Sequence, residues 1–469
     1  MRLQNIFSVY LLSFALSSNA LPKTTHNATL PLSLQMAKSM ISRNQGILTS
    51  SNDSSALLQA GFTQKVFHQL LLTYPNSSHI EAYMTQSIDS VLPLISNATE
   101  DIAYPLDRLS SGNGLLRLYS QTAEEKYSKA VEALRQSINL QPRNEEGGLW
   151  YYTYPYWSYL DGMYSFAPFF TQYILSNSKA TKERGLEDVL HQLDLLWEHC
   201  LIHNEPAKGL LVHGYDASHT AVWSSPLTGG SPHVWGRSLG WYCMALLDTL
   251  SLLSTNTAVF EAKTYLLTRF QELMAAVVRN VDPSTGAWFQ ILDQPDREGN
   301  YVESSGSSMF IYSLLKGVRM GYLHTSSSSH PLSYPYNQTG GKEYVDVATK
   351  AYRFVAETFV VNEENSTLGW NGTVGVCSLN SSASFEVRSV YNFNQIGGYG
   401  KSANGYEMSS IMLQGRWCIT AHWDQRRLCL RLWRWRNSGR KGRDRRGGSE
   451  ILAGCKLFTW EADCLGPSL

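Results

Sequence analysis

The sequence predicts an all-α protein built as an (α/α) barrel, in which buried inner helices are ringed by amphipathic outer helices. Apolar residues recur at spacings of three and four over long stretches between about 30 and 360, and strand patterns are scarce. A unit made of an almost uncharged helix, a short Ser/Thr/Asn turn and an amphipathic helix recurs along the chain. The 469 residues are 43% apolar and 17% charged, which provides a large core and excludes a disordered or fibrous chain.

Copies of this unit begin at Asp107, Asp161, Trp235 and Glu303. Their starting points lie 54, 74 and 68 residues apart, so the repeat is a helical hairpin with variable loops and not a solenoid of fixed period. In each copy the first helix should be buried on all sides, because it carries almost no charge. We therefore expect the N-termini of the inner helices to meet at one rim, where the positive ends of their dipoles suit an anionic ligand.

Four stretches at this rim combine aromatic rings, carboxylates and forked donors, namely 105–116, 147–170, 210–248 and 286–310. Within the third, Arg237 and Trp241 are four residues apart and share a helical face, so with Trp235 they can surround one pocket. A guanidinium binds a carboxylate in bidentate fashion, while an indole packs on the face of a ring. The pattern indicates a receptor for a carboxylate-bearing sugar.

Two carboxylates at neighbouring helix mouths, Asp107 and Asp161, can divide the work of acid/base catalysis, because repulsion raises the pKa of one so that it holds a proton. Each feature also has a structural interpretation. An Asp at a helix start is commonly an N-cap, a single Trp is commonly a core residue, and His213 or His233 alone is commonly an ordinary loop residue. The convergence of four stretches on one rim favours a carbohydrate-active enzyme.

The N-terminus is typical of a secretory signal over residues 1–20, with Arg2, an apolar stretch over 6–16 and the cleavage site Ser18-Asn19-Ala20. We expect a secreted, extracellular protein that has no membrane span in its mature form. The seven cysteines form no disulfide framework, and neither CxxC nor HExxH occurs, so no metal site is expected. Eight glycosylation sequons fit this route and lie at Asn27, Asn52, Asn76, Asn97, Asn337, Asn365, Asn371 and Asn380.

The formal charge is zero, with 39 basic and 39 acidic side chains, which excludes a globally basic nucleic-acid binder. This net charge of zero is the sum of an acidic part and a basic part of the chain. Residues 1–415 carry 27 basic and 34 acidic side chains, a net of −7, whereas 416–469 carry 12 and 5, a net of +7. Most of the basic excess lies within 426–448, so the composition marks a boundary.

Three motifs resemble glycoside hydrolase family 105, the unsaturated rhamnogalacturonyl hydrolases, in its fungal branch. They are YPYWSYLDGMYSFAPF, SPHVWGRSLGWYCMALLD and STGAWFQILDQPDREGNYVESSGSSMFIYSLLKGVRMGYL, and the resemblance covers roughly 35–386. The family implies an (α/α)6 barrel over 21–386 without metal or organic cofactor. Its substrates are pectin oligosaccharides that carry a Δ4,5-unsaturated galacturonic acid at the non-reducing end.

The resemblance also implies a mechanism, the hydration of an enol ether. Asp161, in the LDG motif, would protonate C4 and then activate a water that adds at C5, after which the hemiketal collapses and releases the saturated sugar. Asp107 matches the second aspartate of the family, which would tune Asp161 and orient the substrate. Substrate-binding positions of the family match Tyr159, His213, Trp235, Arg237 and Trp241, with Arg237 the candidate for the uronate carboxylate.

The chain departs from the family in two places. Trp150 and Tyr151 stand where some bacterial members have His-Lys, and Tyr159 stands where they have Trp, which leaves the aglycone open. Beyond Glu386 the last inner helix is missing or altered, and Val387-Arg388 fits a splice-donor sequence. We interpret 387–469 as a retained intron followed by a shifted frame, so no nucleic-acid partner is expected.

Other interpretations stay open. The segment 387–469 could instead be a real basic tail that binds nucleic acid or anionic surfaces through Arg and Trp. For the whole protein, the alternatives are a conventional two-carboxylate glycosidase on the same barrel and a carbohydrate-binding pseudoenzyme. The sequence does not indicate the oligomeric state.

Overall fold

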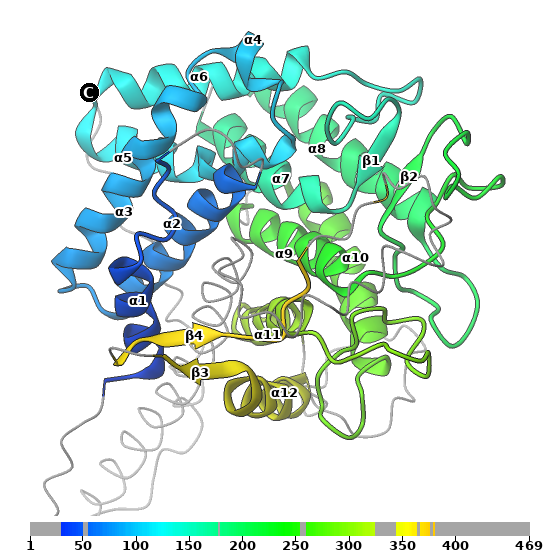
Figure 1. Ribbon diagram of the computed structural model, residues 1–469. Coiled ribbons are helices and arrows are strands. Elements are labelled where there is room, and N and C mark those ends of the chain that lie inside the picture. Colours follow the sequence, from blue (N-terminus) through cyan, green and yellow to red (C-terminus); the bar gives the residue numbers. More distant parts are fainter. Residues whose placement is uncertain are drawn as a thin grey trace, which may run out of the picture.

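The computed structural model describes residues 30–49, 55–176, 179–253, 259–323, 344–363, 366–375 and 379. The predicted signal segment 1–20, the tail 387–469 and the predicted change in the last inner helix lie outside these residues. Within the described part of the chain, helices dominate, which confirms the all-α class (Figure 1).

Inner and outer helices alternate along the chain, as the repeated unit predicts. The inner helices are α2 (Ala56–Thr73), α5 (Gly112–Thr122), α7 (Asp161–Ser176), α9 (Gly236–Leu252) and α11 (Ser304–Arg319). Their outer partners are α3 (Ser78–Val91), α6 (Glu125–Leu140), α8 (Lys179–Cys200), α10 (Phe260–Arg279) and α12 (Tyr344–Phe359). The remaining helices are α1 (Leu32–Ser42), α4 (Ala98–Asp101), and the 3₁₀ turns η1 (Leu92–Leu94) and η2 (Leu106–Ser111).

The inner helices form the curved wall of a barrel. Each packs against its own outer partner, and α7 lies between η2 and α9, with α11 following on the far side of α9 (Figure 1). Residues 236–250 of α9 and 304–317 of α11 are buried without interruption, because these helices face neighbours on every side. The prediction of helices buried on all sides is therefore confirmed for α9 and α11, but it is wrong for α5, in which residues 119–122 are exposed.

The described residues also form two short two-stranded sheets, which the sequence did not predict. Strand β1 (Trp157–Tyr159) pairs antiparallel with β2 (Gly214–Asp216), and β3 (Val360–Asn362) pairs with β4 (Leu368–Trp370). Strands of three residues are too short to show a periodic pattern. The β1–β2 pair matters for function, because it joins the loop that precedes α7 to the segment that leads toward α9.

Two glycines let the N-termini of α9 and α11 approach closely at the rim. A Cβ on Gly306 would lie 2.8 Å from the carbonyl carbon of Gly236, so a larger residue would push the helices apart. This contact sets Arg237 beside the start of α11, where Glu303 is the N-cap and accepts a hydrogen bond from the Gly306 amide.

Candidate active site

Asp161 is the first residue of α7, and partners from two other segments hold its carboxylate. The Oδ2 atom lies 3.3 Å from Nε2 of His213, on the segment before β2, and accepts a hydrogen bond from the Ser238 hydroxyl in the first turn of α9. Ser238 also lies 3.2 Å from the His213 carbonyl oxygen. The arrangement fixes one carboxylate at the junction of two inner-helix mouths.

The local electrostatics favour the charged form of Asp161. Burial raises the pKa of this carboxyl, but hydrogen bonds from His213 and Ser238 and the charge of Arg237 outweigh burial, so the pKa lies below its ordinary value. The sequence led us to expect one carboxylate with a raised pKa. Asp161 is not that group, because His213, Ser238 and Arg237 surround it.

Asp107, in η2, lies at the same rim and has a hydrogen-bond partner of its own. Its Oδ2 accepts a hydrogen bond of 2.8 Å from the Tyr151 hydroxyl. The Tyr151 ring stacks on Tyr159 at 4.9 Å, and Tyr159 lies 4.9 Å from the His213 ring. Burial, followed by the charges of Asp107 and Asp161, raises the pKa of Tyr151 well above its ordinary value, so the phenol remains a donor.

We expect Tyr151→Phe to weaken catalysis without unfolding the protein. Removing a donor from a buried charged acceptor costs about 1–3 kcal/mol, which corresponds to roughly a 5- to 150-fold loss of kcat/KM. The acid limb of the pH–rate profile should also move to higher pH, because the Asp107 carboxylate protonates more readily once it has lost the Tyr151 donor. The control is Tyr173→Phe, which removes the 2.9 Å bond from that hydroxyl to Glu132 on the outer surface. Equal pH profiles for Tyr151→Phe and the wild type would contradict the role of Tyr151 as a donor that stabilises the Asp107 carboxylate.

The structure gives Arg237 partners that the sequence did not predict. Its Nη1 and Nη2 atoms donate to the carbonyl oxygens of Val374 and Gly375, at 2.8 and 2.6 Å, and its guanidinium lies 4.7 Å from the Trp235 ring. The Val374 amide donates to Glu303 at 3.2 Å. The segment after β4 is therefore clamped between α9 and α11, and a uronate carboxylate would have to share or replace its carbonyls at Arg237.

The structure brings only some of the three side chains of the predicted pocket together. Trp235 lies 4.9 Å from the His213 ring and packs with Tyr159, Trp223 and Val374. Trp241 instead belongs to the main core and contacts Tyr164 at 4.5 Å and Phe62 at 5.3 Å. Arg237 and Trp241 do share one face of α9, but Trp241 lies one turn further along the helix and therefore deeper in the barrel.

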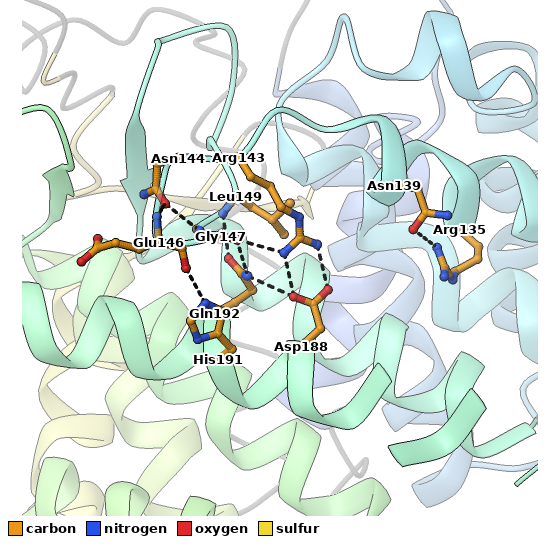
Figure 2. A network of polar contacts seen from close by, with 11 residues as sticks. Arg135, Asn139, Arg143, Asn144, Glu146, Gly147, Leu149, Asp188, His191 and Gln192 are labelled. Atoms are coloured by element: carbon orange, nitrogen blue, oxygen red, sulfur yellow. Dashed lines mark hydrogen bonds and ion pairs between the residues drawn. The ribbon is translucent and has the colours of Figure 1, made fainter. Parts of the chain in front are cut away.

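The loop that carries Tyr151 is anchored on the outer helix α8. Arg143 makes a bidentate pair with Asp188 at 2.7 and 2.8 Å, and Gln192 accepts a hydrogen bond from the Leu149 amide at 2.7 Å (Figure 2). His191 lies 2.6 Å from the carbonyl oxygen of Glu146 in the same network. These bonds fix the segment just before the aromatic residues of the rim.

Sequence reasoning missed three features of the candidate site. Ser238 follows Arg237 in the quoted motif but was not singled out, Tyr151 was noted only as a departure, and the clamped segment at Val374 gave no signal. Among the described residues, no cluster of His, Cys, Asp or Glu could hold a metal ion. No helix in the described ranges is long and apolar enough to cross a membrane.

The barrel and its rim define the class of this protein as a glycoside hydrolase of the six-hairpin type. The chain belongs to Glycosyl Hydrolase Family 88, whose model matches residues 34–403, past the point at Glu386 where the resemblance was expected to end. It is 38% identical over 148 residues to Protein Atu3128 of Agrobacterium fabrum and to the 24.9 kDa protein in picA locus of Rhizobium radiobacter. These matches cover 32% of the chain and 60% of either relative.

Solved structures share the fold. A family 105 glycoside hydrolase of C. acetobutylicum has a TM-score of 0.66 and 27% identity, over 82% of this chain and 99% of that one. A possible GH105 member from Salmonella enterica has a TM-score of 0.58 and 17% identity, over 82% and 92%. The unsaturated glucuronyl hydrolase of Bacillus sp. GL1 shares the fold, with a TM-score of 0.53 and 12% identity over 81% and 94%. The resemblance to family 105 is confirmed, and the fungal branch stays a prediction.

Proposed function

We propose that this protein is an unsaturated uronyl hydrolase that removes Δ4,5-unsaturated galacturonic acid from the non-reducing end of rhamnogalacturonan oligosaccharides. The observation that carries the proposal is the Asp161 carboxylate, held by His213 and Ser238 at a helix mouth and within the field of Arg237. A carboxylate that can exchange a proton beside a cation suits an anionic substrate. The solved unsaturated glucuronyl hydrolase of the same fold supports this class of reaction.

The proposed reaction adds one water molecule across the C4=C5 double bond. Asp161 donates a proton to C4, and positive charge develops at C5 and the ring oxygen. Water adds at C5 and returns a proton to Asp161, giving a hemiketal. The proton of the C5 hydroxyl passes to the ring oxygen as the bond from C5 to that oxygen breaks, which gives a ketone at C5 and a hemiacetal at C1. The hemiacetal hydroxyl then passes its proton to the aglycone oxygen as the bond from C1 to that oxygen breaks, which releases the aglycone and leaves an aldehyde at C1. One residue acts first as acid and then as base, so the separation rule for paired carboxylates does not apply.

The acid role requires Asp161 to hold a proton despite its lowered pKa. A bound substrate raises the pKa of Asp161 for two reasons. The substrate carboxylate brings a second negative charge to the site, and the substrate ring excludes water from it. His213, whose Nε2 lies 3.3 Å from the Asp161 carboxylate, holds that carboxylate in place beside the substrate.

The substrate class is tested by incubating the full-length protein with lyase-generated oligosaccharides. Rhamnogalacturonan products should lose the ultraviolet absorbance of the C4=C5 bond faster than unsaturated products of homogalacturonan. A preference for homogalacturonan products would overturn the rhamnogalacturonan assignment while leaving the uronyl hydrolase intact. Binding of the oligosaccharides by a folded protein, without loss of absorbance, would instead identify the carbohydrate-binding pseudoenzyme.

A further inference from the structure

The clamped segment that follows β4, residues 371–375, is docked on the start of α11. Figure 1 shows the chain leaving β4 and running past α11 toward α9. Ser304, the first residue of α11, donates from its amide to the Gly372 carbonyl at 3.1 Å, and its hydroxyl lies 2.7 Å from the Thr373 hydroxyl. The indole N–H of Trp370 donates to the same Ser304 hydroxyl at 3.0 Å. These bonds fix the segment before it reaches the rim.

Glu303 holds the end of the clamped segment. This residue is only 1% exposed, and its two carboxylate oxygens accept different amides. Oε2 accepts the Gly306 amide of α11 at 2.8 Å, and Oε1 accepts the Val374 amide of the clamped segment at 3.2 Å. The Ser305 hydroxyl lies 2.7 Å from both oxygens. One carboxylate therefore caps the helix and anchors the segment.

The anchored segment in turn fixes the guanidinium of Arg237 over the Trp235 ring. The carbonyls of Val374 and Gly375 accept Nη1 and Nη2, and the guanidinium lies 4.7 Å from the ring. A guanidinium carries five N–H donors, and Nε of Arg237 makes no hydrogen bond among the described residues. The donors that the segment does not use can therefore bind a carboxylate.

This arrangement orients a cation without neutralising it. An arginine side chain has many rotamers, and a ligand that must order the side chain loses affinity. Backbone carbonyls fix the guanidinium but carry no formal charge to cancel its own. The negative charge of Glu303 is bound by amides and a hydroxyl, so Glu303 acts on Arg237 through the Val374 peptide. An anionic ligand then meets a cation that is already in place.

We infer that Glu303 is a positioning residue for recognition of the uronate: through the Val374 peptide it orients Arg237 toward the carboxylate of the sugar. The inference rests on the proposed function, which places the uronate at Asp161 and Arg237. It deepens that function, because it assigns a role in substrate recognition to a carboxylate that does not touch the substrate. Glu303 takes no part in proton transfer.

The test compares Glu303→Gln with the wild type on an unsaturated uronyl disaccharide and on its methyl ester, which lacks the carboxylate charge. Glutamine has an acceptor oxygen on one side only, so one amide bond is lost, and we expect the longer bond, to Val374, to break. KM for the acid should rise about tenfold, the scale of one lost hydrogen bond to a charged group. The value of kcat for the acid and KM for the ester should each change less than about threefold.

Two further variants separate positioning from a defect of the helix cap. Ser304→Ala removes the hydroxyl that contacts Thr373 and Trp370 but leaves the Glu303 cap in place, and it should also raise KM for the acid alone. The matched control is Glu363→Gln, the same substitution at an exposed residue that follows β3. It should leave KM for the acid and for the ester unchanged.

Equal losses on the acid and the ester, or an unchanged KM for the acid in both Glu303→Gln and Ser304→Ala, would overturn the positioning role while leaving the hydrolase activity in place. Calorimetry with the acid and the ester separates the two proposals. If the wild type binds the acid but does not hydrolyse it, the proposed function fails. A Kd that rises about tenfold in Glu303→Gln for the acid alone would still support the positioning role. Equal Kd values for the wild type and both variants would reject it.

Discussion

Asp161→Asn should lower kcat on an unsaturated uronyl disaccharide by about 10²- to 10⁴-fold, the scale of a lost general acid/base. The amide cannot donate a proton to C4 and then accept one from water, although it can still accept the Ser238 hydroxyl bond. The thermal midpoint should stay within about 3 °C of the wild type, because the substitution keeps the side-chain volume. Single-turnover kinetics, with the enzyme in saturating excess over the substrate, measures the chemical step.

The matched control is Asp346→Asn, which also neutralises an aspartate in the first turn of a helix but lies exposed on the outer helix α12. It reproduces the loss of helix-dipole stabilisation, about 0.3–1 kcal/mol, without touching the rim. A rate for Asp161→Asn within tenfold of the wild type would remove Asp161 from the acid/base role.

Asp248→Ala should have the largest effect on stability, with a loss of about 3–5 kcal/mol. Asp248, on α9, accepts hydrogen bonds from Lys316 at 2.6 Å and Tyr312 at 2.9 Å on α11, and forms an ion pair with Lys65 on α2. The cluster ties α2 to α9 and α11 across the barrel. Removing the carboxylate leaves two lysine ammonium groups inside the protein without the anion they share.

The pH dependence of stability distinguishes this mechanism from a simple packing defect. Burial, together with the charge of Lys316, lowers the pKa of Lys65 well below its ordinary value of 10.5. A lysine with a lowered native pKa binds fewer protons in the folded state, so stability rises with pH from the native pKa up to 10.5. Loss of the carboxylate lowers the pKa of Lys65 further. Part of the defect of Asp248→Ala should therefore be recovered as pH increases through this window.

Chemical denaturation across pH measures both effects. The control is Asp188→Ala, which breaks the half-exposed pair with Arg143 on the outer surface and should cost about 1 kcal/mol. A loss of less than 1 kcal/mol for Asp248→Ala, or a loss that does not change with pH, would show that the cluster does not stabilise the barrel.

The sequence was informative where helix patterns and local motifs carry the structure. The hairpins that begin at Asp107, Asp161, Trp235 and Glu303 were predictable, because an uncharged helix before an amphipathic one has few other places to lie. The N-termini of these inner helices meet at one rim, because each copy of the unit enters the barrel in the same direction. Their clusters are linked there through Tyr151, Ser238 and the clamped segment.

The remaining features depend on contacts between distant segments, which a single sequence does not encode locally. The partners of Arg237 at Val374 and Gly375 lie more than a hundred residues away along the chain. The depth of Trp241 depends on Phe62 from the first inner helix. Periodicity assigns a residue to a helix face but does not place it along the barrel axis.

The central claim is that Asp161 hydrates a double bond instead of hydrolysing an ordinary glycoside. Its most direct test gives the full-length protein two disaccharides that are identical except for the C4=C5 double bond in the uronic acid, and follows both by proton NMR. We predict loss of the vinyl C4 proton and release of the aglycone from the unsaturated disaccharide only. Cleavage of the saturated disaccharide at a comparable rate would contradict the account and favour a conventional two-carboxylate glycosidase.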